Sequence, residues 1–355
     1  MKSLNLFKNK KVLITGHNGF KGSWLSIWLS LLGAKLVGIS LPNKSKNNHF
    51  NLVKNKLKMK SYYFDIRNKI KLEKIILKEK PDFFFHLAAQ SLVSTSMLNP
   101  RFNWETNVIG LFNVLEILNK LKNNCVGVII TSDKCYKNLE VKRGYKENDI
   151  LGGEDPYSAS KASAEILFHS YFKSFILKKN NRLRLCTARA GNVIGGGDWS
   201  KNRLIPDCTK MWLKNKVPII RNPNSTRPWQ HVLEALFGYL CLSIELKKNK
   251  KINGQSFNFS SNKIKNISVI KFLNKIRNKW GKVRWKINKK NKFYESSLLQ
   301  LNNNKSKKLL KWSAKLNLDE TIDFVINWYK KFDDDYKNIY EISKNQIIKF
   351  TEKKV

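Results

Sequence analysis

The chain has too few cysteines, in the wrong arrangement, for a disulfide framework or a cysteine-rich metal centre. Five occur among its 355 residues, an odd number, and no two of them form a Cys-x-x-Cys pair. Disulfide scaffolds and structural zinc sites need paired, regularly spaced cysteines. We therefore expect free thiols, no bound metal and a cytoplasmic location.

Long apolar runs are also missing. No stretch approaches the roughly 20 consecutive apolar residues that a membrane-spanning helix requires. The sequence passes from Met1, Lys2 and Ser3 almost directly into a strand-like segment. We therefore expect no signal peptide and no membrane partner.

Acidic residues are scarce, at 26 Asp and Glu against 68 Lys and Arg, which gives a formal net charge of +42. Such a charge is compatible with nucleic-acid binding, or with a drift in composition that spreads lysine and asparagine over the whole surface. The lysines are scattered, and no zinc-finger or RNA-binding signature accompanies them. We favour drift, expect no nucleic-acid partner, and expect the basic surface to attract an anionic substrate.

What the chain does have is a regular alternation of apolar runs and helix-like segments. Hydrophobic residues make up 42% of the sequence, which is enough for a core. Short apolar runs lie at 11–15, 36–40, 82–87, 126–131 and 183–188. Strands that alternate with helices indicate βαβ units. The prediction is an α/β fold with a Rossmann-type, doubly wound parallel sheet.

The pattern becomes less regular after residue 190, where loops rich in glycine, proline and asparagine begin. We predict a dinucleotide-binding domain at 1–190 and a smaller substrate-binding domain at 191–330. Segments within about 229–260 are expected to pack back on the first domain, and 331–355 to form a charged C-terminal tail. Loops of this kind usually carry binding groups at the carboxyl edge of the sheet.

A glycine-rich turn follows the first predicted strand and precedes a helical stretch. Its glycines permit a tight turn and let the backbone approach a pyrophosphate at the helix N-terminus. A strand–helix turn without a ligand is the alternative, but the strand, the helix and the position in the chain all favour dinucleotide binding. The residues predicted to contact the cofactor here are Gly16, Asn18, Gly19, Phe20, Lys21 and Gly22.

The region after the second strand lacks the acidic residue that usually binds the adenosine ribose of NAD. Lys44 lies there instead and is suited to the 2′-phosphate of NADP, so this region leaves the two cofactors open. Asp65, with Ile66, ends a later strand, where its carboxylate can accept a hydrogen bond from an adenine amine. A helix N-cap is the alternative role for Asp65.

Small residues at the end of the fourth predicted strand give a cofactor room to lie against the backbone. This segment contains Leu87, Ala88, Ala89 and Gln90. Tight packing of a helix on the sheet is the alternative. Asn107 is expected either to touch the cofactor or to brace the sheet, and the sequence does not separate these two roles.

Two short segments carry the chemistry. Tyr157 and Lys161 are one helical turn apart, so we expect the ammonium to lower the pKa of the phenol and make Tyr157 a general base. Ser132, Asp133 and Lys134 follow the strand at 126–131 and add an acid and a second ionisable group. An acid/base pair beside a redox centre suggests oxidation coupled to another step, such as elimination. The alternative for Ser132, Asp133 and Lys134 is a surface turn. The alternative for Tyr157 and Lys161 is an ordinary position on the surface of a helix.

The chain resembles the extended short-chain dehydrogenase/reductases and, within them, the family of CDP-glucose 4,6-dehydratases. The resemblance runs to about residue 328. Its motif segments are 15–25, 131–136, 152–162, 189–199 and 225–232. Two positions depart from the pattern: Asn18 replaces a threonine, and 94–97 replaces a more basic segment next to the site.

The resemblance implies a three-step reaction on CDP-glucose with NAD as the cofactor. Tyr157, assisted by Lys161, takes the C4 hydroxyl proton while hydride passes from C4 to NAD, and Ser132 orients that oxygen. Lys134 then removes the C5 proton and Asp133 protonates the departing C6 hydroxyl, although the division between these two stays open. Asp133 needs a raised pKa for this role. Hydride then returns to C6.

The resemblance also implies substrate contacts and an assembly. Arg227 is expected to bind the diphosphate, with a surface ion pair as the alternative. Asn192 is expected at a phosphate or the sugar, and Asp198 and Trp199 are further substrate-binding candidates.

Relatives pair through a helix bundle that includes the Tyr157 helix, so a homodimer or homotetramer is expected. The implied context is deoxysugar biosynthesis for a surface polysaccharide, including O-antigen and lipopolysaccharide. The alternatives are another nucleotide-sugar 4,6-dehydratase, a 4-epimerase, a basic nucleic-acid-binding protein or an inactive scaffold.

Overall fold

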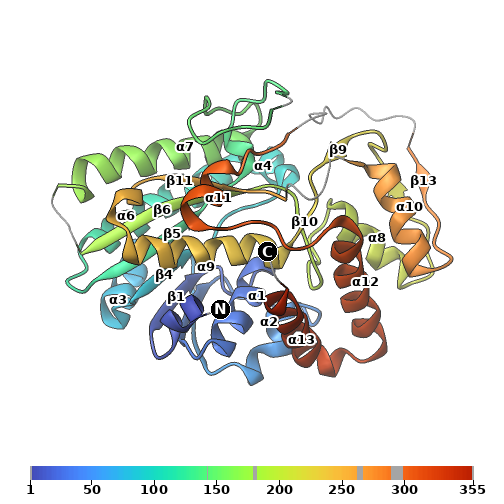
Figure 1. The fold of residues 1–355 in the computed structure, drawn as a ribbon, viewed down its shortest axis with the longest axis horizontal. Helices are drawn as coiled ribbons and strands as arrows, with labels where there is room; N and C mark the ends of the chain where they lie inside the picture. The colour runs from blue at the N-terminus through green and yellow to red at the C-terminus, as the bar shows by residue number, and fades with distance from the viewer. Residues whose placement is uncertain (1, 142, 179–181, 262–266, 289–298, 354–355) are drawn as a thin grey trace.

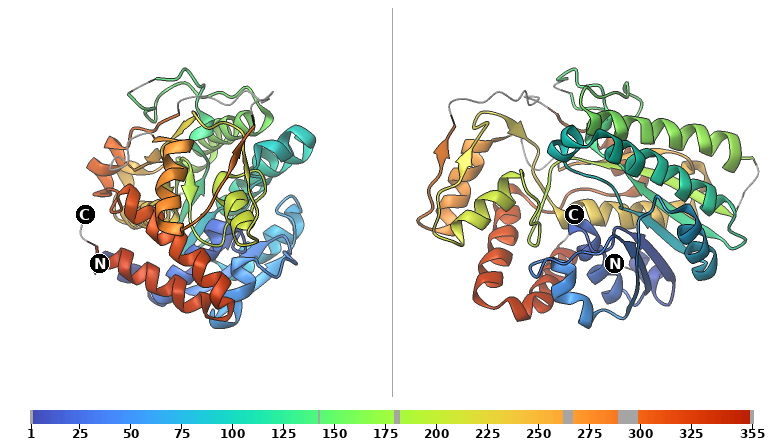
Figure 2. Two further views of the ribbon diagram at one scale, coloured as in Figure 1. Left: turned by 90° about the vertical axis from the view of Figure 1, so that its right-hand side faces the viewer. Right: turned by 180° about the vertical axis from the view of Figure 1, so that it is seen from behind.

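A seven-stranded parallel sheet with helices on both faces forms the centre of the protein (Figures 1 and 2). The computed structural model describes residues 2–141, 143–178, 182–261, 267–288 and 299–353. The strand order is β11-β6-β5-β4-β1-β2-β3, and every neighbouring pair is parallel. This confirms the predicted Rossmann-type, doubly wound α/β fold. The strands are β1 (Lys11–Thr15), β2 (Lys35–Ser40), β3 (Met59–Tyr63), β4 (Phe83–His86), β5 (Cys125–Ile130), β6 (Leu183–Ala190) and β11 (Ser256–Phe259).

Alternating side chains of each strand enter two separate cores, because successive residues of a strand point to opposite faces of the sheet. In β1, Val12 and Ile14 belong to one core and Leu13 to the other. The helices over the first face are α1 (Phe20–Leu31), α9 (Val232–Lys248) and α13 (Ile339–Glu352). Those over the second are α3 (Lys69–Glu79), α6 (Gly110–Asn119) and α7 (Pro156–Tyr171).

Most of the remaining elements follow β6 in the chain. Before it lie α2 (His49–Val53), α4 (Val93–Leu98), α5 (Pro100–Trp104), the π-helical turn η3 (Glu105–Ile109) and the 3-10 turn η4 (Asp133–Cys135). After it lie β7 (Val193–Ile194), α8 (Leu204–Trp212), β8 (Ile219–Ile220), β9 (Thr226–Arg227), β10 (Gln230–His231), β12 (Ile267–Ser268), α10 (Val269–Trp280), β13 (Lys286–Ile287), α11 (Asn304–Leu310) and α12 (Leu318–Asp334). Within 229–260, α9 and β11 pack on the sheet. The division into domains at residue 190 stays a prediction.

The segment 331–355, expected as a charged tail, contains the end of α12 and the whole of α13. The Phe350 ring of α13 packs edge-on against Trp28 of α1, with ring centroids 5.6 Å apart. Lys315 donates from Nζ to the carbonyl oxygens of Phe350 and Thr351, at 3.3 and 3.1 Å. A cation at the C-terminal end of a helix is favourable because the last carbonyls lack helical partners. Helix α13 is therefore docked against the helices that cover the first face of the sheet.

The part of the chain that the structure describes contains no helix that is long and apolar enough to cross a membrane. Within the same residues, no three His, Cys, Asp or Glu side chains come together as a metal site. All five cysteines are free thiols.

One buried carboxylate holds α7 against three neighbouring strands of the sheet. Glu165 accepts hydrogen bonds from Thr131 after β5, from Thr187 in β6 at 2.9 Å and from Ser256 in β11 at 3.0 Å. It also forms a fully buried ion pair with Arg189 of β6, at 2.8 Å. Since Tyr157 and Lys161 lie on the same helix as Glu165, this network fixes where they enter the site.

The charge of Arg189 governs the ionisation of Glu165. Burial alone would raise the pKa of this carboxyl, but the guanidinium and the hydroxyl donors hold it at about 2. The folded-state pKa is below the unfolded value, so the stabilisation is present above about pH 4.5 and is lost as the pH falls toward 2. The lowered pKa of Glu165 corresponds to a stabilisation of the folded state by about 3 kcal/mol.

We expect Glu165→Gln to lower the free energy of unfolding by about 3–5 kcal/mol, because it leaves the buried Arg189 guanidinium without a counter-charge. Urea denaturation followed by circular dichroism measures this. Glu116→Gln is the matched control: its pair with Lys69 is half exposed, so its loss should cost less than about 1 kcal/mol. An equal effect of the two substitutions would contradict the role given to Glu165.

Candidate active site

A cleft of about 1610 Å³ lies at the carboxyl edge of the sheet, between the strands and the elements that follow β6. Twenty of the twenty-two residues predicted for the site line it. They are Gly16, Asn18, Gly19, Phe20, Lys21, Gly22, Asp65, Ile66, Leu87, Ala88, Ala89, Gln90, Ser132, Asp133, Lys134, Tyr157, Lys161, Asn192, Asp198 and Arg227. The other two, Asn107 and Trp199, are not among the residues that line the cleft.

The glycine-rich turn has the shape that a dinucleotide requires. Gly16 has a φ of +76°, and a Cβ there would lie 2.7 Å from the backbone nitrogen of Ala88. A Cβ on Gly22 would lie 2.1 Å from the carbonyl oxygen of Gly16. The backbone is therefore packed as closely as glycine allows, and the open N-terminus of α1 faces the cleft, where a pyrophosphate is stabilised. These residues fit a bound dinucleotide.

The region after β2 is built from neutral hydrogen-bonding groups. The Asn18 amide donates to the Leu41 carbonyl at 2.6 Å, and the Ser40 hydroxyl lies 2.9 Å from the His17 ring. Burial lowers the pKa of His17 to about 4, so this ring is neutral at physiological pH. Lys44 is exposed and is not among the residues that line the cleft.

Asp65 lines the cleft with its carboxylate held by Arg67. The guanidinium of Arg67 donates from Nε and Nη2 to one carboxylate oxygen, at 3.0 and 2.8 Å. The alternative N-cap role for Asp65 is wrong, because Asn68 caps α3. The guanidinium also lies over the ring of Phe102, at 4.9 Å.

Asn107 is a brace. Its amide nitrogen donates to the Gln90 carbonyl at 3.0 Å and to the Ser160 hydroxyl at 2.9 Å, while its oxygen accepts from the Gln90 backbone at 2.9 Å. It thus ties the loop after β4 to α7. Of the two roles that the sequence left open for Asn107, the structure supports bracing.

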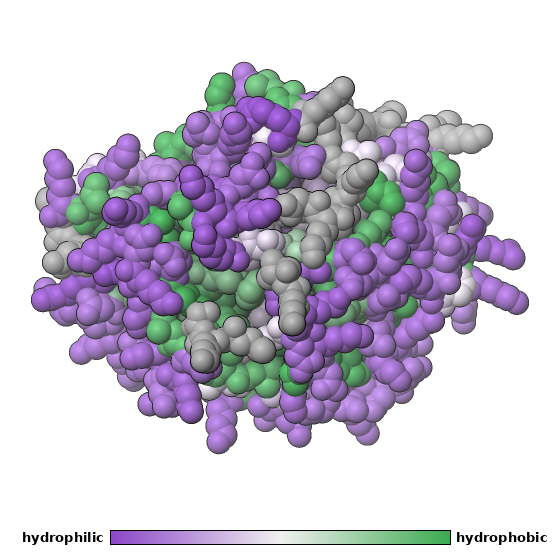
Figure 3. Space-filling model, in the orientation of Figure 1, coloured by the Kyte–Doolittle hydropathy of each residue, from purple (hydrophilic) through white to green (hydrophobic). Residues whose placement is uncertain are grey.

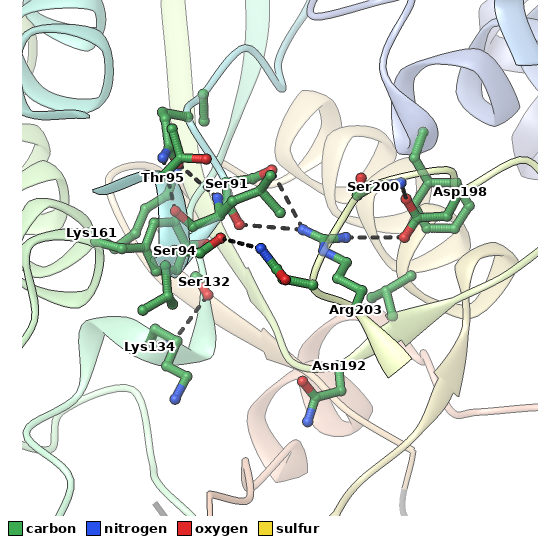
Figure 4. Close-up of a pocket in the computed structure, with 18 of the residues that line it drawn as sticks. Ser91, Ser94, Thr95, Ser132, Lys134, Lys161, Asn192, Asp198, Ser200 and Arg203 are labelled. Atoms are coloured by element: carbon green, nitrogen blue, oxygen red, sulfur yellow. Dashed lines mark hydrogen bonds and ion pairs between the residues drawn. The ribbon is translucent and has the colours of Figure 1, made fainter. Parts of the chain in front are cut away.

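The chemical groups meet where β5 ends and α7 begins (Figure 4). The Ser132 hydroxyl donates to Asp133 Oδ1 at 2.9 Å and accepts from the Lys134 backbone N–H at 3.2 Å. The Lys161 ammonium lies 6.0 Å from the centre of the Tyr157 ring. The acid at 133, the tyrosine and the second lysine therefore line one cleft together with Ser132.

Burial sets the ionisation of this group of side chains. It raises the pKa of Asp133, as an acid catalyst requires, and lowers the pKa of Lys161 to about 8. The pKa of Tyr157 is raised, again mainly by burial, although the nearby Ser132 hydroxyl acts in the opposite direction. The expectation of a lowered pKa for Tyr157 is therefore wrong, since burial outweighs the contacts that favour the phenolate.

Arg203 crosses the cleft and was not predicted from the sequence. Its guanidinium pairs with Asp198 at 3.2 Å on one wall and donates to the carbonyl and hydroxyl of Ser91 at 3.3 and 3.4 Å on the other (Figure 4). Arg203 directly precedes α8, outside the segments that carry the resemblance. A single arginine after a glycine-rich loop is not part of a sequence motif that would identify it as a site residue.

Trp199 belongs to the support of the cleft. Its ring packs against those of Tyr329 and Phe332, with centroids 5.2 and 4.9 Å apart. Tyr329 in turn donates from its hydroxyl to the Asp198 carbonyl at 2.7 Å. These contacts hold the loop that carries Asp198, and they do not support a substrate contact by Trp199.

The turn, the Tyr-x-x-x-Lys pair and the adjacent acid and base define a dinucleotide-dependent enzyme of the extended short-chain dehydrogenase type. Residues 13–324 match the family model described as GDP-mannose 4,6 dehydratase, and the chain belongs to this family. A CDP-glucose 4,6-dehydratase of Salmonella typhimurium is 40% identical over 330 residues, which cover 92% of each chain. A dTDP-D-glucose 4,6-dehydratase of Dictyostelium discoideum is 30% identical, over 73% of this chain and 62% of that protein.

Solved structures show the same fold. The epimerase Mth375 of Methanothermobacter thermautotrophicus has a TM-score of 0.81 at 21% identity, over 96% of this chain and 97% of that one. The dTDP-glucose 4,6-dehydratase of Bacillus anthracis, solved in complex with NAD, has a TM-score of 0.76 at 21% identity, over 93% and 99%.

We expect Gly16→Ala to weaken NAD binding at least tenfold, because the new Cβ would strain a positive φ and collide with Ala88. Titration calorimetry measures the affinity. Gly33→Ala is the matched control: its φ is +74°, but its Cβ would meet only Lys8, away from the cleft. It should cost stability and leave NAD affinity unchanged. A normal affinity in Gly16→Ala would contradict the placement of the dinucleotide at this turn.

Proposed function

We propose that the chain is an NAD-dependent CDP-glucose 4,6-dehydratase, a hydro-lyase that converts CDP-D-glucose to CDP-4-dehydro-6-deoxy-D-glucose and water. The observation that carries the proposal is the position of Asp133 and Lys134 beside Tyr157 and Lys161, in one cleft with the dinucleotide turn. The 40% identity to a CDP-glucose 4,6-dehydratase over 92% of both chains supports the choice of substrate.

NAD would be held by the turn at Gly16–Gly22, by the loop after β4 and by Tyr157 and Lys161. When bound, it would supply the redox chemistry, as acceptor of hydride from C4 of the sugar and donor of hydride to C6. The neutral groups around Asn18 and Ser40, with Lys44 outside the cleft, favour NAD over a cofactor with a 2′-phosphate.

The protein residues move the protons. Tyr157 receives the proton of the C4 hydroxyl, and Lys161 supplies positive charge beside it. The resulting 4-keto group makes the C5 proton acidic, so oxidation has to come first. Lys134 takes that C5 proton and later returns it. Asp133, whose pKa is raised by burial, protonates the departing C6 hydroxyl.

The substrate diphosphate is anionic, and the arginines that line the cleft suit it. Arg227 and Arg203 line the cleft, as does Asn192. A guanidinium binds phosphate oxygens through two parallel hydrogen bonds, which makes arginine the appropriate residue here. Asp198 positions Arg203 through their ion pair.

We infer no role in nucleic-acid binding. Figure 3 shows hydrophilic residues over most of the visible face. The lysines are scattered along the whole sequence, which supports an origin of the +42 charge in composition. The cytoplasmic location stays a prediction from the cysteine usage and the lack of long apolar runs in the sequence. The place in deoxysugar and surface-polysaccharide synthesis stays a prediction from the resemblance.

The test is to incubate the purified protein with CDP-glucose, with and without added NAD. We expect a 4-keto-6-deoxy product, seen by its base-induced absorbance and by the loss of one water in the mass spectrum. No net NADH should accumulate, because hydride leaves C4 and returns to C6. UDP-glucose and dTDP-glucose serve as controls; faster turnover of either would keep the mechanism and reject CDP-glucose as the substrate.

Asp133→Asn separates this function from 4-epimerisation on the same fold. A dehydratase needs the acid at position 133, so the variant should still oxidise C4 but form no 6-deoxy product. A 4-epimerase needs only the Tyr157 and Lys161 pair. An undiminished yield of the 6-deoxy sugar from the variant would remove Asp133 from the mechanism.

We further propose a homodimer formed through α7 and the helix of residues 100–119. These run side by side on the back of the protein (Figure 2, right). Their outer surface exposes large apolar side chains: Trp104 is 39% exposed, Ile109 51% and Ile166 58%. Exposed apolar side chains on two neighbouring helices are typical of a surface that a second copy covers.

Multi-angle light scattering after gel filtration should give twice the chain mass of 41.4 kDa, or four times if two dimers associate. The double variant Ile109→Glu, Ile166→Glu should be a monomer, because it places four carboxylates in the interface. Ile70→Glu is the control, since Ile70 is 82% exposed but lies on α3. A monomeric natural chain would reject the proposed dimer.

A further inference from the structure

The two walls of the cleft are joined by side-chain hydrogen bonds. One wall contributes Ser91 and Ser94, which follow β4, and the other contributes Asn202 and Arg203, which precede α8. Arg203 donates from Nη2 to the carbonyl and hydroxyl oxygens of Ser91, at 3.3 and 3.4 Å, and Asn202 donates from Nδ2 to Ser94 Oγ at 3.1 Å (Figure 4). We call these four residues the clasp.

The clasp lies closer to solvent than the catalytic residues of the same cleft. Ser91 and Asn202 are exposed, and the Arg203 side chain is 34% exposed. The exposed fractions of Ser132 and Asp133, by contrast, are 7% and 5%. A ligand that enters from solvent therefore meets the clasp before it reaches the acid at Asp133.

Arg203 is held more firmly at one end than at the other. Its Nη1 pairs at 3.2 Å with the buried carboxylate of Asp198, which also accepts from the Ser200 backbone N–H at 3.0 Å. Tyr329 donates to the Asp198 carbonyl at 2.7 Å and so fixes this end. The contacts with Ser91 are long and exposed, and their acceptors are neutral, which makes them weaker than a bond between two charged groups. The clasp therefore opens at Ser91.

Opening needs only the rotation of the Asn202 and Arg203 side chains, because the backbone of both walls is held. Asn202 has a φ of +62°, in the left-handed region that asparagine tolerates, and its carbonyl accepts from Arg221 Nη2 at 3.3 Å. On the facing wall, the Gln90 side chain bonds both the carbonyl and the N–H of Leu92, at 2.8 and 2.7 Å. The clasp can thus open and close without a change of fold.

We propose that the clasp closes the cleft of the free protein, and that the diphosphate of an incoming nucleotide sugar opens it by drawing Arg203 away from Ser91. The proposal rests on the proposed function, which supplies the diphosphate. An anionic phosphate oxygen is a stronger acceptor for a guanidinium than a neutral serine oxygen. Arg203 turns to the phosphate while its bond to Asp198 keeps the guanidinium in the cleft. Departure of the nucleotide lets the clasp close again.

A closed clasp lowers the apparent affinity for the nucleotide. Only the open fraction of the molecules is ready to bind, so the measured dissociation constant is the intrinsic constant divided by that fraction. Loss of a clasp hydrogen bond raises the open fraction and should tighten binding. Loss of a residue that contacts the nucleotide, or of one that only supports the fold, would weaken binding. The direction of the change therefore distinguishes the clasp from these two roles.

The test is titration calorimetry of NAD-loaded protein with CDP, which carries the diphosphate but has no sugar to react. Asn202→Gly removes the bond to Ser94, and glycine adopts the left-handed backbone without strain. We expect this variant to bind CDP about two- to tenfold more tightly than the natural chain, and Ser94→Ala to show the same gain. The double variant should gain no more than either single one, because both substitutions remove the same bond.

Asn215→Gly is the matched control. Asn215 also has a left-handed backbone, with a φ of +53°, but it lies in an exposed turn after α8 and is not among the residues that line the cleft. Its substitution should leave the affinity for CDP unchanged. Ser91→Ala should show a smaller gain than Asn202→Gly, because the Ser91 carbonyl stays in place as an acceptor for Arg203.

The clasp and the proposed function can fail separately. Unchanged or weaker binding of CDP by both Asn202→Gly and Ser94→Ala would overturn the clasp, even if the natural chain converts CDP-glucose. Tighter binding by both variants, with no further gain in the double variant, would uphold the clasp. If CDP-glucose is then not converted by the natural chain, the proposed reaction is rejected and the clasp remains as a gate for a nucleoside diphosphate.

Discussion

The buried ion pair between Glu165 and Arg189 is the interaction on which the arrangement of the site depends. Glu165 holds α7, which carries Tyr157 and Lys161. Arg189 holds the other half of the site, because its guanidinium donates at 2.6 Å to the hydroxyl of Tyr136, two residues beyond Lys134. One pair of charges thus sets the position of the tyrosine base against that of the acid and second base. A pair without solvent has little freedom to shift, which suits groups that have to meet within hydrogen-bond distance.

The opposite wall of the cleft is set by aromatic packing from the end of the chain. Trp24 of α1 donates to the Gly196 carbonyl at 2.9 Å, and a Cβ on Gly196 would lie 2.0 Å from the Trp328 ring. Because the residues before Asp198 are glycines, α12 can pack closely against this loop. This support comes from residues more than a hundred positions away, so the C-terminal helices contribute to the site without entering it.

The sequence predicted the sheet, the turn and the cluster at Ser132 because each depends on local spacing. Glycines next to a strand and a helix, and a tyrosine one turn from a lysine, have the same meaning in any chain of this fold. Arg203 and the true place of Trp199 depend instead on which distant segments meet across the cleft. The raised pKa of Tyr157 escaped prediction for a related reason, since neighbours in sequence indicate the nearest charges but not the depth of burial.

The contrast between the surface and the site explains why a net charge of +42 is compatible with acid/base chemistry. Exposed lysines act through water and salt, which weaken their effect within about 10 Å. The groups in the cleft are buried, and burial is the first cause of the pKa shifts at Asp133, Tyr157 and Lys161 alike. Drift in the surface composition can therefore proceed while the fold preserves the site. The Glu165–Arg189 pair contributes to this, because Glu165 accepts a hydrogen bond from Thr131, the residue directly before Ser132.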